Sequence, residues 1–150
     1  MTLEQWRKVV DVDLTAQFLM ARAAGQRMIK AGKGGAIIST ASMSGHIVNV
    51  PQPQCAYNAA KAGLIHLTKS LATEWAKYNI RVNCTSPGYM ATPLSIDVPR
   101  ERMENWFFFA PMKRMGLPEE LQGAVVYLAS EAASYTTGAD IIIDGGYSCV

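Results

Sequence analysis

Stretches with the hydrophobic periodicity of a helix alternate along this sequence with short, nearly apolar stretches that are typical of buried strands. Helices are expected over residues 2–30, 56–78 and from 118 to about 128, with a shorter one over 102–109, and strands over 36–40, 80–85 and 139–143. Strands that alternate with helices run parallel and are joined by right-handed crossovers. The pattern therefore predicts an α/β fold with a doubly wound parallel sheet. Its loops should open toward one crevice at the carboxyl ends of the strands.

Local signals mark the ends of the expected helices. Thr2 and Gln5 have the spacing of a capping box, which predicts that the first helix begins there. Gly32 follows the end of that helix. Pro118 suits the first position of the third helix, where its missing N–H costs no hydrogen bond.

Length and composition exclude several classes of protein. The chain has 150 residues, of which 49% are hydrophobic, so one compact domain with a real core is expected. The net charge is +2 and the basic residues are scattered, which argues against a nucleic-acid partner. No apolar run reaches the roughly 18 residues that a membrane span needs. The three cysteines have no paired spacing, so neither a disulfide framework nor a metal site is expected, and a reduced, cytoplasmic setting fits best.

Tyr57 and Lys61 stand four residues apart at the start of the second expected helix and therefore share one face of it. An ammonium near a phenol favours the ionised phenol, and a tyrosine so placed could transfer a proton near neutral pH. Such a pair is also common by chance, and the alternative is two ordinary helix residues. The preceding apolar strand and the hydroxyl-bearing loop at Ser42 and Ser44 favour the catalytic interpretation, because they would place all these groups at one edge of the sheet.

Five elements of the chain resemble the short-chain dehydrogenase/reductase family in order and spacing. They are residues 42–45 (Ser-Met-Ser-Gly), 57–63 (Tyr-Asn-Ala-Ala-Lys-Ala-Gly), 81–88 (Arg-Val-Asn-Cys-Thr-Ser-Pro-Gly), 137–138 (Thr-Gly) and 144–146 (Asp-Gly-Gly). Residues 40–46 and 135–140 are most similar to the fungal-type polyol enzymes: mannitol dehydrogenases, sorbose reductases and arabinitol dehydrogenases. The resemblance covers essentially the whole chain. It implies a partial, Rossmann-like parallel sheet with about three strands and three long helices.

The resemblance also implies roles for the polar residues of the predicted site. Tyr57 is the proton donor and acceptor at the substrate oxygen, and Lys61 makes Tyr57 more acidic and holds the nicotinamide ribose. Ser42 donates a hydrogen bond to the substrate oxygen, with Ser44 as the alternative. His46 and Asn49 are candidates for contacts with a sugar hydroxyl, although a histidine in a loop is more often only solvated.

The cofactor that the resemblance implies is NADP or NAD, with NADP favoured. The segment that would hold its nicotinamide carboxamide comprises Pro87, Gly88, Met90 and Thr92. A Pro-Gly break lets backbone polar groups face a ligand, although an ordinary turn at the end of a strand has the same composition. The aromatic run 106–109 stands where the family has a mobile lid over the substrate, and core packing is the equal alternative.

Two features depart from the family pattern. Asp13 stands where the family usually has asparagine, on a partly buried face where an unpaired carboxylate would be costly. Asp13 is therefore expected to pair with Lys61 and to join a proton relay, the alternative being a solvated helix residue. The Gly-rich phosphate turn is also missing from residues 1–150, because Gly32, Gly34 and Gly35 follow a helix rather than a strand. The chain is therefore expected to be the C-terminal part of a family domain.

The function expected from the resemblance is hydride transfer between a ketose and a polyol with NAD(P)(H). One alternative is a 3-oxoacyl carrier-protein reductase, which has the same chemistry on another substrate. The other is a non-catalytic fragment that serves as an interaction module. The small-molecule substrate is expected to be a sugar or polyol, and the two long helices are expected to form a homo-oligomer.

Overall fold

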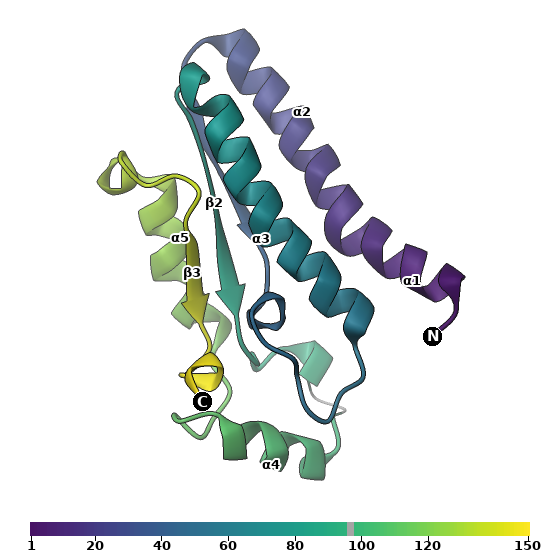
Figure 1. The fold of residues 1–150 in the computed structure, drawn as a ribbon. Helices are drawn as coiled ribbons and strands as arrows, with labels where there is room; N and C mark the ends of the chain where they lie inside the picture. Colours follow the sequence, from purple (N-terminus) through teal and green to yellow (C-terminus); the bar gives the residue numbers. More distant parts are fainter. Residues whose placement is uncertain (96–97) are drawn as a thin grey trace.

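The computed structural model describes residues 1–95 and 98–150 (Figure 1). The helices are α1 (Leu3–Val10), α2 (Ala16–Ala31), α3 (Cys55–Trp75), α4 (Arg100–Phe109) and α5 (Gln122–Ala129), and the strands are β1 (Gly35–Thr40), β2 (Ile80–Pro87) and β3 (Asp140–Ile143). Every predicted helix and strand is present, with bounds within a few residues of those expected. In the part of the chain that the structure describes, no helix combines the length and the apolar character needed to cross a membrane.

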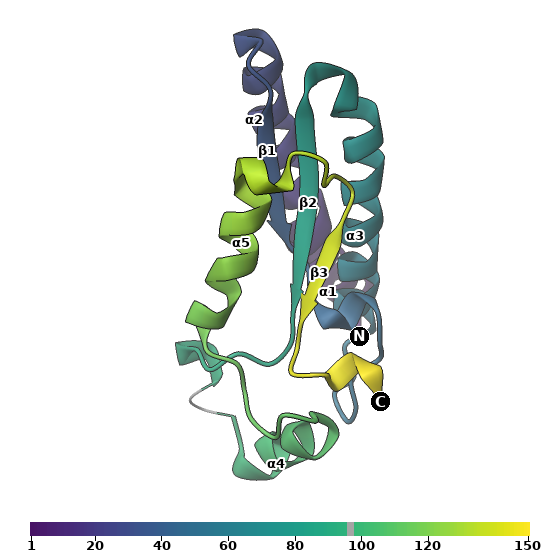
Figure 2. The same ribbon diagram turned by 90° about the vertical axis from the view of Figure 1, so that its left-hand side faces the viewer.

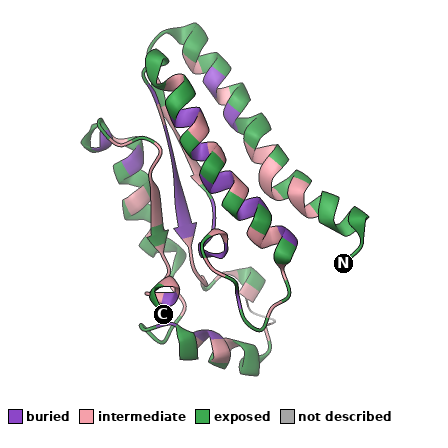
Figure 3. Ribbon diagram, viewed as in Figure 1, coloured by how far each residue is buried: buried purple, intermediate pink, exposed green. Residues whose placement is uncertain are grey.

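The three strands form one parallel sheet in the order β1-β2-β3, which confirms the predicted fold class. Gly35 to Thr40 pair in register with Ile80 to Thr85, and Cys84 to Pro87 pair with Asp140 to Ile143. β2 is the buried strand, as Figure 3 shows, whereas β1 is only partly buried. The sequence predicted that residues 36–40 are buried on both faces, and this is only partly right. Among the described residues β1 is an edge strand with β2 as its one partner.

Helices cover both faces of the sheet. α2 and α3 lie on one face and α5 on the other (Figure 2). Small and branched side chains form the core between α2, α3 and β2, among them Ala21, Leu71 and Val82. This layering is the doubly wound arrangement that the alternating pattern predicted.

The first predicted helix is continuous but not uniform. The capping box is present: the Thr2 hydroxyl accepts a hydrogen bond from the Gln5 N–H at 3.2 Å, and the Thr2 N–H donates to Gln5 Oε1 at 2.8 Å. A π-helical turn at Asp11–Thr15 then separates α1 from α2. Gly32 ends α2 in the left-handed conformation, with φ of +67°, as its position predicted. Sequence periodicity does not reveal the π-helical turn, because the pattern of apolar residues continues through it.

Asn83 and Arg81 connect β2 to the segment that leads into β3. The Asn83 side chain is fully buried, donates to the Thr136 carbonyl at 2.9 Å and accepts from the Ala139 N–H at 3.0 Å. The Arg81 guanidinium donates to the Leu128 carbonyl at 2.8 Å, near the end of α5. Both side chains satisfy backbone groups that would otherwise be buried without partners. They hold β3 and α5 against the central strand.

Candidate active site

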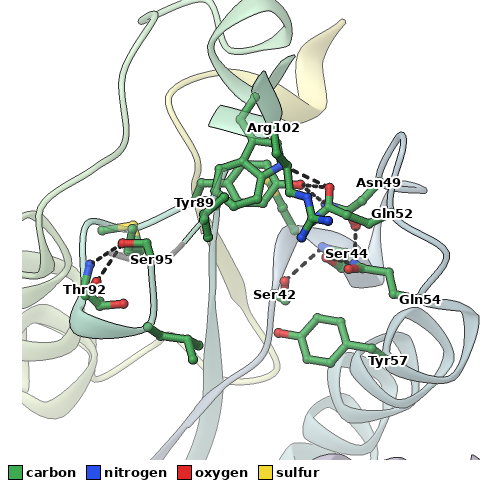
Figure 4. A pocket seen from close by; sticks show the side chains of 16 residues that line it. Ser42, Ser44, Asn49, Gln52, Gln54, Tyr57, Tyr89, Thr92, Ser95 and Arg102 are labelled. Carbon is green, nitrogen blue, oxygen red and sulfur yellow. Dashed lines mark hydrogen bonds between the residues drawn. The ribbon is translucent and has the colours of Figure 1, made fainter. Parts of the chain in front are cut away.

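A cavity of about 470 Å³ lies beyond the carboxyl ends of β1 and β2, where the fold predicts ligand binding (Figure 4). Its walls come from the loop after β1, the start of α3, the segment after β2 and α4. The residues that line it are Ser42, Met43, Ser44, Asn49, Gln52, Gln54, Tyr57, Gly88, Tyr89, Met90, Thr92, Leu94, Ser95, Val98, Arg102 and Trp106. Four segments far apart in the sequence thus contribute to one pocket.

Ser42 is held by a tight turn directly after β1. Its hydroxyl accepts a hydrogen bond from the Ser44 N–H at 3.1 Å, and its carbonyl accepts from the Gly45 N–H at 2.9 Å. The turn lies flat against α3, because a side chain at Gly45 would place its Cβ only 2.6 Å from Ile65 Cδ1 and 2.9 Å from the Lys61 carbonyl carbon. The position of the Ser42 hydroxyl is therefore coupled to the same helix that carries Tyr57 and Lys61.

Tyr57 lines the cavity from the first turn of α3, and Lys61 lies one turn behind it. Figure 4 shows Tyr57 and Ser42 on the same side of the pocket. The Lys61 ammonium is buried and lies 5.4 Å from the centre of the Tyr57 ring. It donates to the Thr40 carbonyl at 3.3 Å, at the end of β1. The structure thus brings together Ser42, Tyr57 and Lys61, as the sequence predicted.

Asp13 supplies the counter-charge for this buried lysine. Its Oδ1 lies 3.2 Å from Lys61 Nζ, so the pairing expected from the sequence is present. Asp13 stands in the middle of the π-helical turn between α1 and α2. A π-helical turn changes the direction of the side chains in it, and such turns are frequent at functional sites. A buried ammonium without a partner would be strongly unfavourable, and Asp13 offsets part of that cost.

The segment after β2 forms the opposite wall. Gly88, Met90 and Thr92 line the cavity, whereas Pro87 ends β2 and does not. Gly88 has no room for a side chain, since a Cβ there would lie 2.7 Å from the Asp144 Cα and Cβ. The Thr92 N–H donates to Ser95 Oγ at 3.0 Å, and Ser95 Oγ donates back to the Thr92 carbonyl at 2.7 Å. These bonds give the segment a defined course along the pocket.

A chain of hydrogen-bonded amide and aromatic groups forms the remaining wall, which we call the amide wall: Asn49, Gln52, Gln54, Tyr89 and Trp106. Gln54 Nε2 donates to Asn49 Oδ1 at 2.7 Å, and Asn49 Nδ2 donates to the Tyr89 hydroxyl at 3.0 Å. Gln52 Oε1 accepts two hydrogen bonds, from the Tyr89 hydroxyl at 2.9 Å and from Trp106 Nε1 at 3.0 Å. The Tyr89 ring stacks on Trp106 at 3.9 Å. Trp106 is thus buried, as the core-packing interpretation of the aromatic run expects, and it also lines the pocket. The mobile lid stays a prediction.

The two tyrosines of the cavity have different environments. Burial raises the pKa of Tyr89 above its ordinary value of 10.0, although hydrogen bonds with Asn49 and Gln52 act in the opposite direction. Its phenol is therefore neutral and bonded within the wall. The Tyr57 hydroxyl, in contrast, has no hydrogen-bond partner among residues 1–95 and 98–150 and is open to a ligand.

The prediction that His46 contacts the substrate is not supported, because His46 does not line the cavity. Its Nε2 lies 2.6 Å from Oδ2 of Asp140, at the start of β3. The Asp140 side chain is only 8% exposed, and a buried carboxylate requires such partners. Asn49 does reach the cavity, and Ser44 lines it while accepting a hydrogen bond from Gln54 Nε2 at 3.2 Å.

Among the pocket residues that the sequence did not predict are Gln52, Gln54, Tyr89 and Arg102. Gln52 and Gln54 stand in a loop rich in proline and polar residues, where no periodicity indicates direction. Arg102 reaches the pocket from α4, whose placement depends on the tertiary fold. Tyr89 directly follows Pro87 and Gly88, which were predicted to lie at the site, and this position in the sequence could have indicated that Tyr89 lines the pocket. Of the described residues, no three histidine, cysteine or acidic side chains are grouped so that they could hold a metal ion.

Comparison with known proteins decides the family. A family model described as enoyl-(acyl carrier protein) reductase matches residues 1–148. A solved short-chain type dehydrogenase/reductase from Mycobacterium marinum is 49% identical and superposes with a TM-score of 0.96, covering 100% of this chain and 59% of that one. The chain belongs to the short-chain dehydrogenase/reductase family.

Within this family, the chain is similar to fungal polyol enzymes, as the sequence predicted. It is 56% identical over 146 residues to a probable NADP-dependent mannitol dehydrogenase of Yarrowia lipolytica, covering 97% of this chain and 52% of the relative. It is 50% identical over 146 residues to a sorbose reductase of Candida albicans, with the same coverage of 97% and 52%. This short-chain dehydrogenase/reductase chain therefore spans about half the length of the relatives it matches.

Proposed function

We propose that the protein containing this chain is an NAD(P)-dependent oxidoreductase that interconverts a ketose and a polyol. The observation that carries the proposal is the joint placement of Ser42 and Tyr57 at one cavity, with the Lys61–Asp13 pair directly behind them. The relatives named mannitol dehydrogenase and sorbose reductase, each at least 50% identical, support the polyol substrate.

Each polar group has a defined part in the proposed reaction. Tyr57 donates a proton to the substrate oxygen when a ketose is reduced and accepts it back when a polyol is oxidised. Ser42 holds that oxygen by donating its hydroxyl proton, since a carbonyl oxygen can only accept, while the Ser42 oxygen itself accepts from the Ser44 N–H. The positive charge of Lys61 stabilises the ionised form of Tyr57, and Asp13 keeps the ammonium in position.

The residues at the cavity fit a nicotinamide cofactor. Gly88, Met90 and Thr92 line the same cavity as Tyr57 and Ser42. The Tyr57 hydroxyl is open to a ligand. A bound nicotinamide would supply the hydride. We propose that Pro87, Gly88, Met90 and Thr92 hold its carboxamide end and that Tyr57 and Lys61 hold its ribose. NADP is the favoured form, in keeping with the name of the Yarrowia lipolytica relative.

The amide wall favours a polyhydroxylated substrate over an acyl chain. Gln52 Oε1 already accepts two hydrogen bonds, which fixes the amide and leaves its N–H groups as donors at the cavity surface. A sugar hydroxyl can satisfy these donors, whereas an acyl chain would leave them unpaired, at a cost of about 1–3 kcal/mol for a buried group. The family description names an acyl carrier-protein substrate, so a 3-oxoacyl reductase is the second candidate.

The proposal extends to assembly and compartment. Val12, in the π-helical turn, and Leu19 and Met20, in α2, are exposed apolar side chains of the first predicted long helix. We propose that the two predicted long helices, residues 2–30 and 56–78, mediate a homo-oligomer. All three cysteines are free, which supports a reduced, cytoplasmic setting.

The test is a substrate panel on the intact protein with NADPH and NADH. We expect sorbose and the ketose formed from mannitol to be reduced, while a 3-oxoacyl thioester is not. Gln52→Leu should raise KM for the sugar more than it lowers kcat, because it removes donors that bind substrate and leaves the reacting groups in place. Turnover of the thioester alone would support the second candidate. Absence of turnover on every substrate would contradict both and favour a non-catalytic interaction module.

A further inference from the structure

A second polar cluster adjoins the Ser42 turn and does not line the cavity. Asp140, at the start of β3, is its centre. The Ser86 hydroxyl of β2 is within 2.8 Å of both carboxylate oxygens of Asp140, and His46 Nε2 lies 2.6 Å from Oδ2. Ser86 is fully buried, Asp140 is 8% exposed and His46 is 32% exposed. The cluster therefore joins three segments that are far apart in the sequence.

His46 is the residue that connects this cluster to the Ser42 turn. The turn comprises the short 3-10 helix Met43–Gly45, and the His46 N–H closes it by donating to the Met43 carbonyl at 2.8 Å. The side chain of the same residue then bonds to Asp140. A movement of His46 away from β3 would consequently pull on the backbone that carries the Ser42 hydroxyl.

The turn has contacts on three sides. Gly45 packs against α3 without room for a Cβ, Ser44 Oγ accepts from Gln54 Nε2 at 3.2 Å, and His46 bonds to Asp140 at 2.6 Å. The first contact is steric, and the second is to a loop residue. The third is the shortest and joins the turn to the sheet itself through a buried carboxylate.

We propose that His46 and Asp140 are positioning residues that hold the Ser42 turn in register with α3. Neither side chain touches the substrate. Their contact fixes where the Ser42 hydroxyl stands relative to Tyr57. The role in turnover rests on the function proposed above, whereas the structural part of the inference, that the contact immobilises the turn, does not.

The experiment uses His46→Phe in the intact protein, which keeps ring volume and removes the hydrogen bond. His46→Gln places an amide nitrogen near the position of Nε2 and is the conservative rescue. His66, the other histidine of the chain, is exposed on α3, and His66→Phe is the matched control. Should His46→Phe not fold, Asp140→Ala removes the same bond from the other side. Asp140→Ala also removes the bond from Ser86, so the double variant should be no worse than Asp140→Ala alone if His46 acts only through Asp140.

The first measurement is amide hydrogen exchange, which requires no substrate. Exchange of the Ser44, Gly45 and His46 amides should rise by roughly tenfold in His46→Phe, while the amides of β2 keep wild-type rates. His46→Gln should restore most of the protection, and His66→Phe should change nothing. Unchanged exchange of the turn in both His46→Phe and Asp140→Ala would overturn the inference.

The second measurement is kinetic. His46→Phe should lower kcat by roughly tenfold or more, with KM for the sugar and the affinity for NADPH nearly unchanged, because a misplaced Ser42 affects the reacting oxygen most. A rise in KM alone would show that His46 touches the substrate and would overturn the positioning role, as would faster exchange with unchanged kcat. If the wild-type protein turns over no ketose or polyol, the proposed function has failed, and the exchange data alone decide whether the contact immobilises the turn.

Discussion

At the scale of single residues, substitutions of Tyr57 and Lys61 should distinguish the loss of proton transfer from the loss of cofactor binding. Tyr57→Phe removes the transferable proton and leaves the ring in place, so kcat should fall by roughly 10²–10⁴. NADPH affinity should be largely kept, because Lys61 remains to hold the ribose. Lys61→Ala should damage both, because the ammonium stands behind Tyr57 and is proposed to hold the ribose. Steady-state kinetics and NADPH fluorescence titration measure the two effects. Near wild-type turnover in Tyr57→Phe would rule out its proposed role.

The pairing of Asp13 with Lys61 predicts how substitutions of Asp13 should change the pH dependence of turnover. Its carboxylate orients Lys61, so Asp13→Ala should leave the ammonium less well placed and move the acid limb of the pH–rate profile for polyol oxidation upward. Asp13→Asn keeps an oxygen acceptor at the same place and should have a smaller effect. Superimposable profiles in both variants would mean that Asp13 does not tune Tyr57. A downward shift would mean that its own charge outweighs its orienting effect.

Cys84 provides a pH-dependent test of the buried sheet. Burial, and secondarily the Asp140 carboxylate, raises the pKa of Cys84 from its ordinary 9.0 to about 12. The neutral thiol should resist alkylation at pH 8 in the native protein, while the exposed Cys55 and Cys149 react, as mass-spectrometric mapping can show. Since the folded-state pKa is the higher one, the stability that depends on the neutral thiol is complete below pH 9 and lost between about 9 and 12. Rapid labelling of Cys84 would indicate that β2 opens.

At the scale of elements, the contact between α2 and α3 depends on one glycine. A Cβ at Gly25 would lie 2.8 Å from two ring atoms of Trp75, so Gly25→Ala should lower the free energy of unfolding by about 1–2 kcal/mol. Gly123, in α5, has no neighbour within 4 Å of such an atom. Gly123→Ala should therefore raise that free energy by about 0.5–1 kcal/mol through helix propensity alone. Denaturant unfolding measures both free energies. Equal stabilisation by the two changes would show that the Trp75 ring can move away from the added Cβ without loss of stability.

Elements also differ in how far the sequence predicts them. Helix ends depend on local chemistry, and the Thr2–Gln5 capping box and the left-handed Gly32 both appear where the sequence predicts them. The π-helical turn at Asp11–Thr15 is not predicted, because the pattern of apolar residues continues through it; in the structure the turn contacts α3. The same turn places Asp13 against Lys61, so the detail that periodicity misses is also the one that completes the site.

At the scale of the whole molecule, the outer side of α1 and α2 should govern self-association. Leu19 and Met20 are 44% and 72% exposed, so exchanging both for glutamate should cost little folding stability. If these helices form the oligomer, the Leu19→Glu/Met20→Glu protein should sediment as a smaller species, because burying two carboxylates at an interface is costly. Val48→Glu, in a loop where Val48 is 77% exposed, is the control. Identical sedimentation of all three proteins would place the interface elsewhere.

The sequence by itself determined those features of the protein that depend on hydrophobic periodicity and on interactions between residues close together in the chain. The alternating pattern predicts the parallel sheet, and the spacing of Tyr57 and Lys61 places both on one face of α3, since a helix repeats every 3.6 residues. Ser42 follows β1 directly, so its place at the sheet edge is also encoded locally. These features need no knowledge of distant residues.

Only the tertiary structure decided the partners of side chains in loops. His46 and Asp140 are 94 residues apart, and nothing around His46 in the sequence indicates that its imidazole will form a hydrogen bond with a buried carboxylate. Gln52 likewise becomes part of the pocket because Tyr89 and Trp106, from the segment after β2 and from α4, donate to the same amide oxygen. Loop backbones have no repeat that fixes the direction of a side chain. Their side chains are placed by buried polar groups elsewhere in the chain that must find partners.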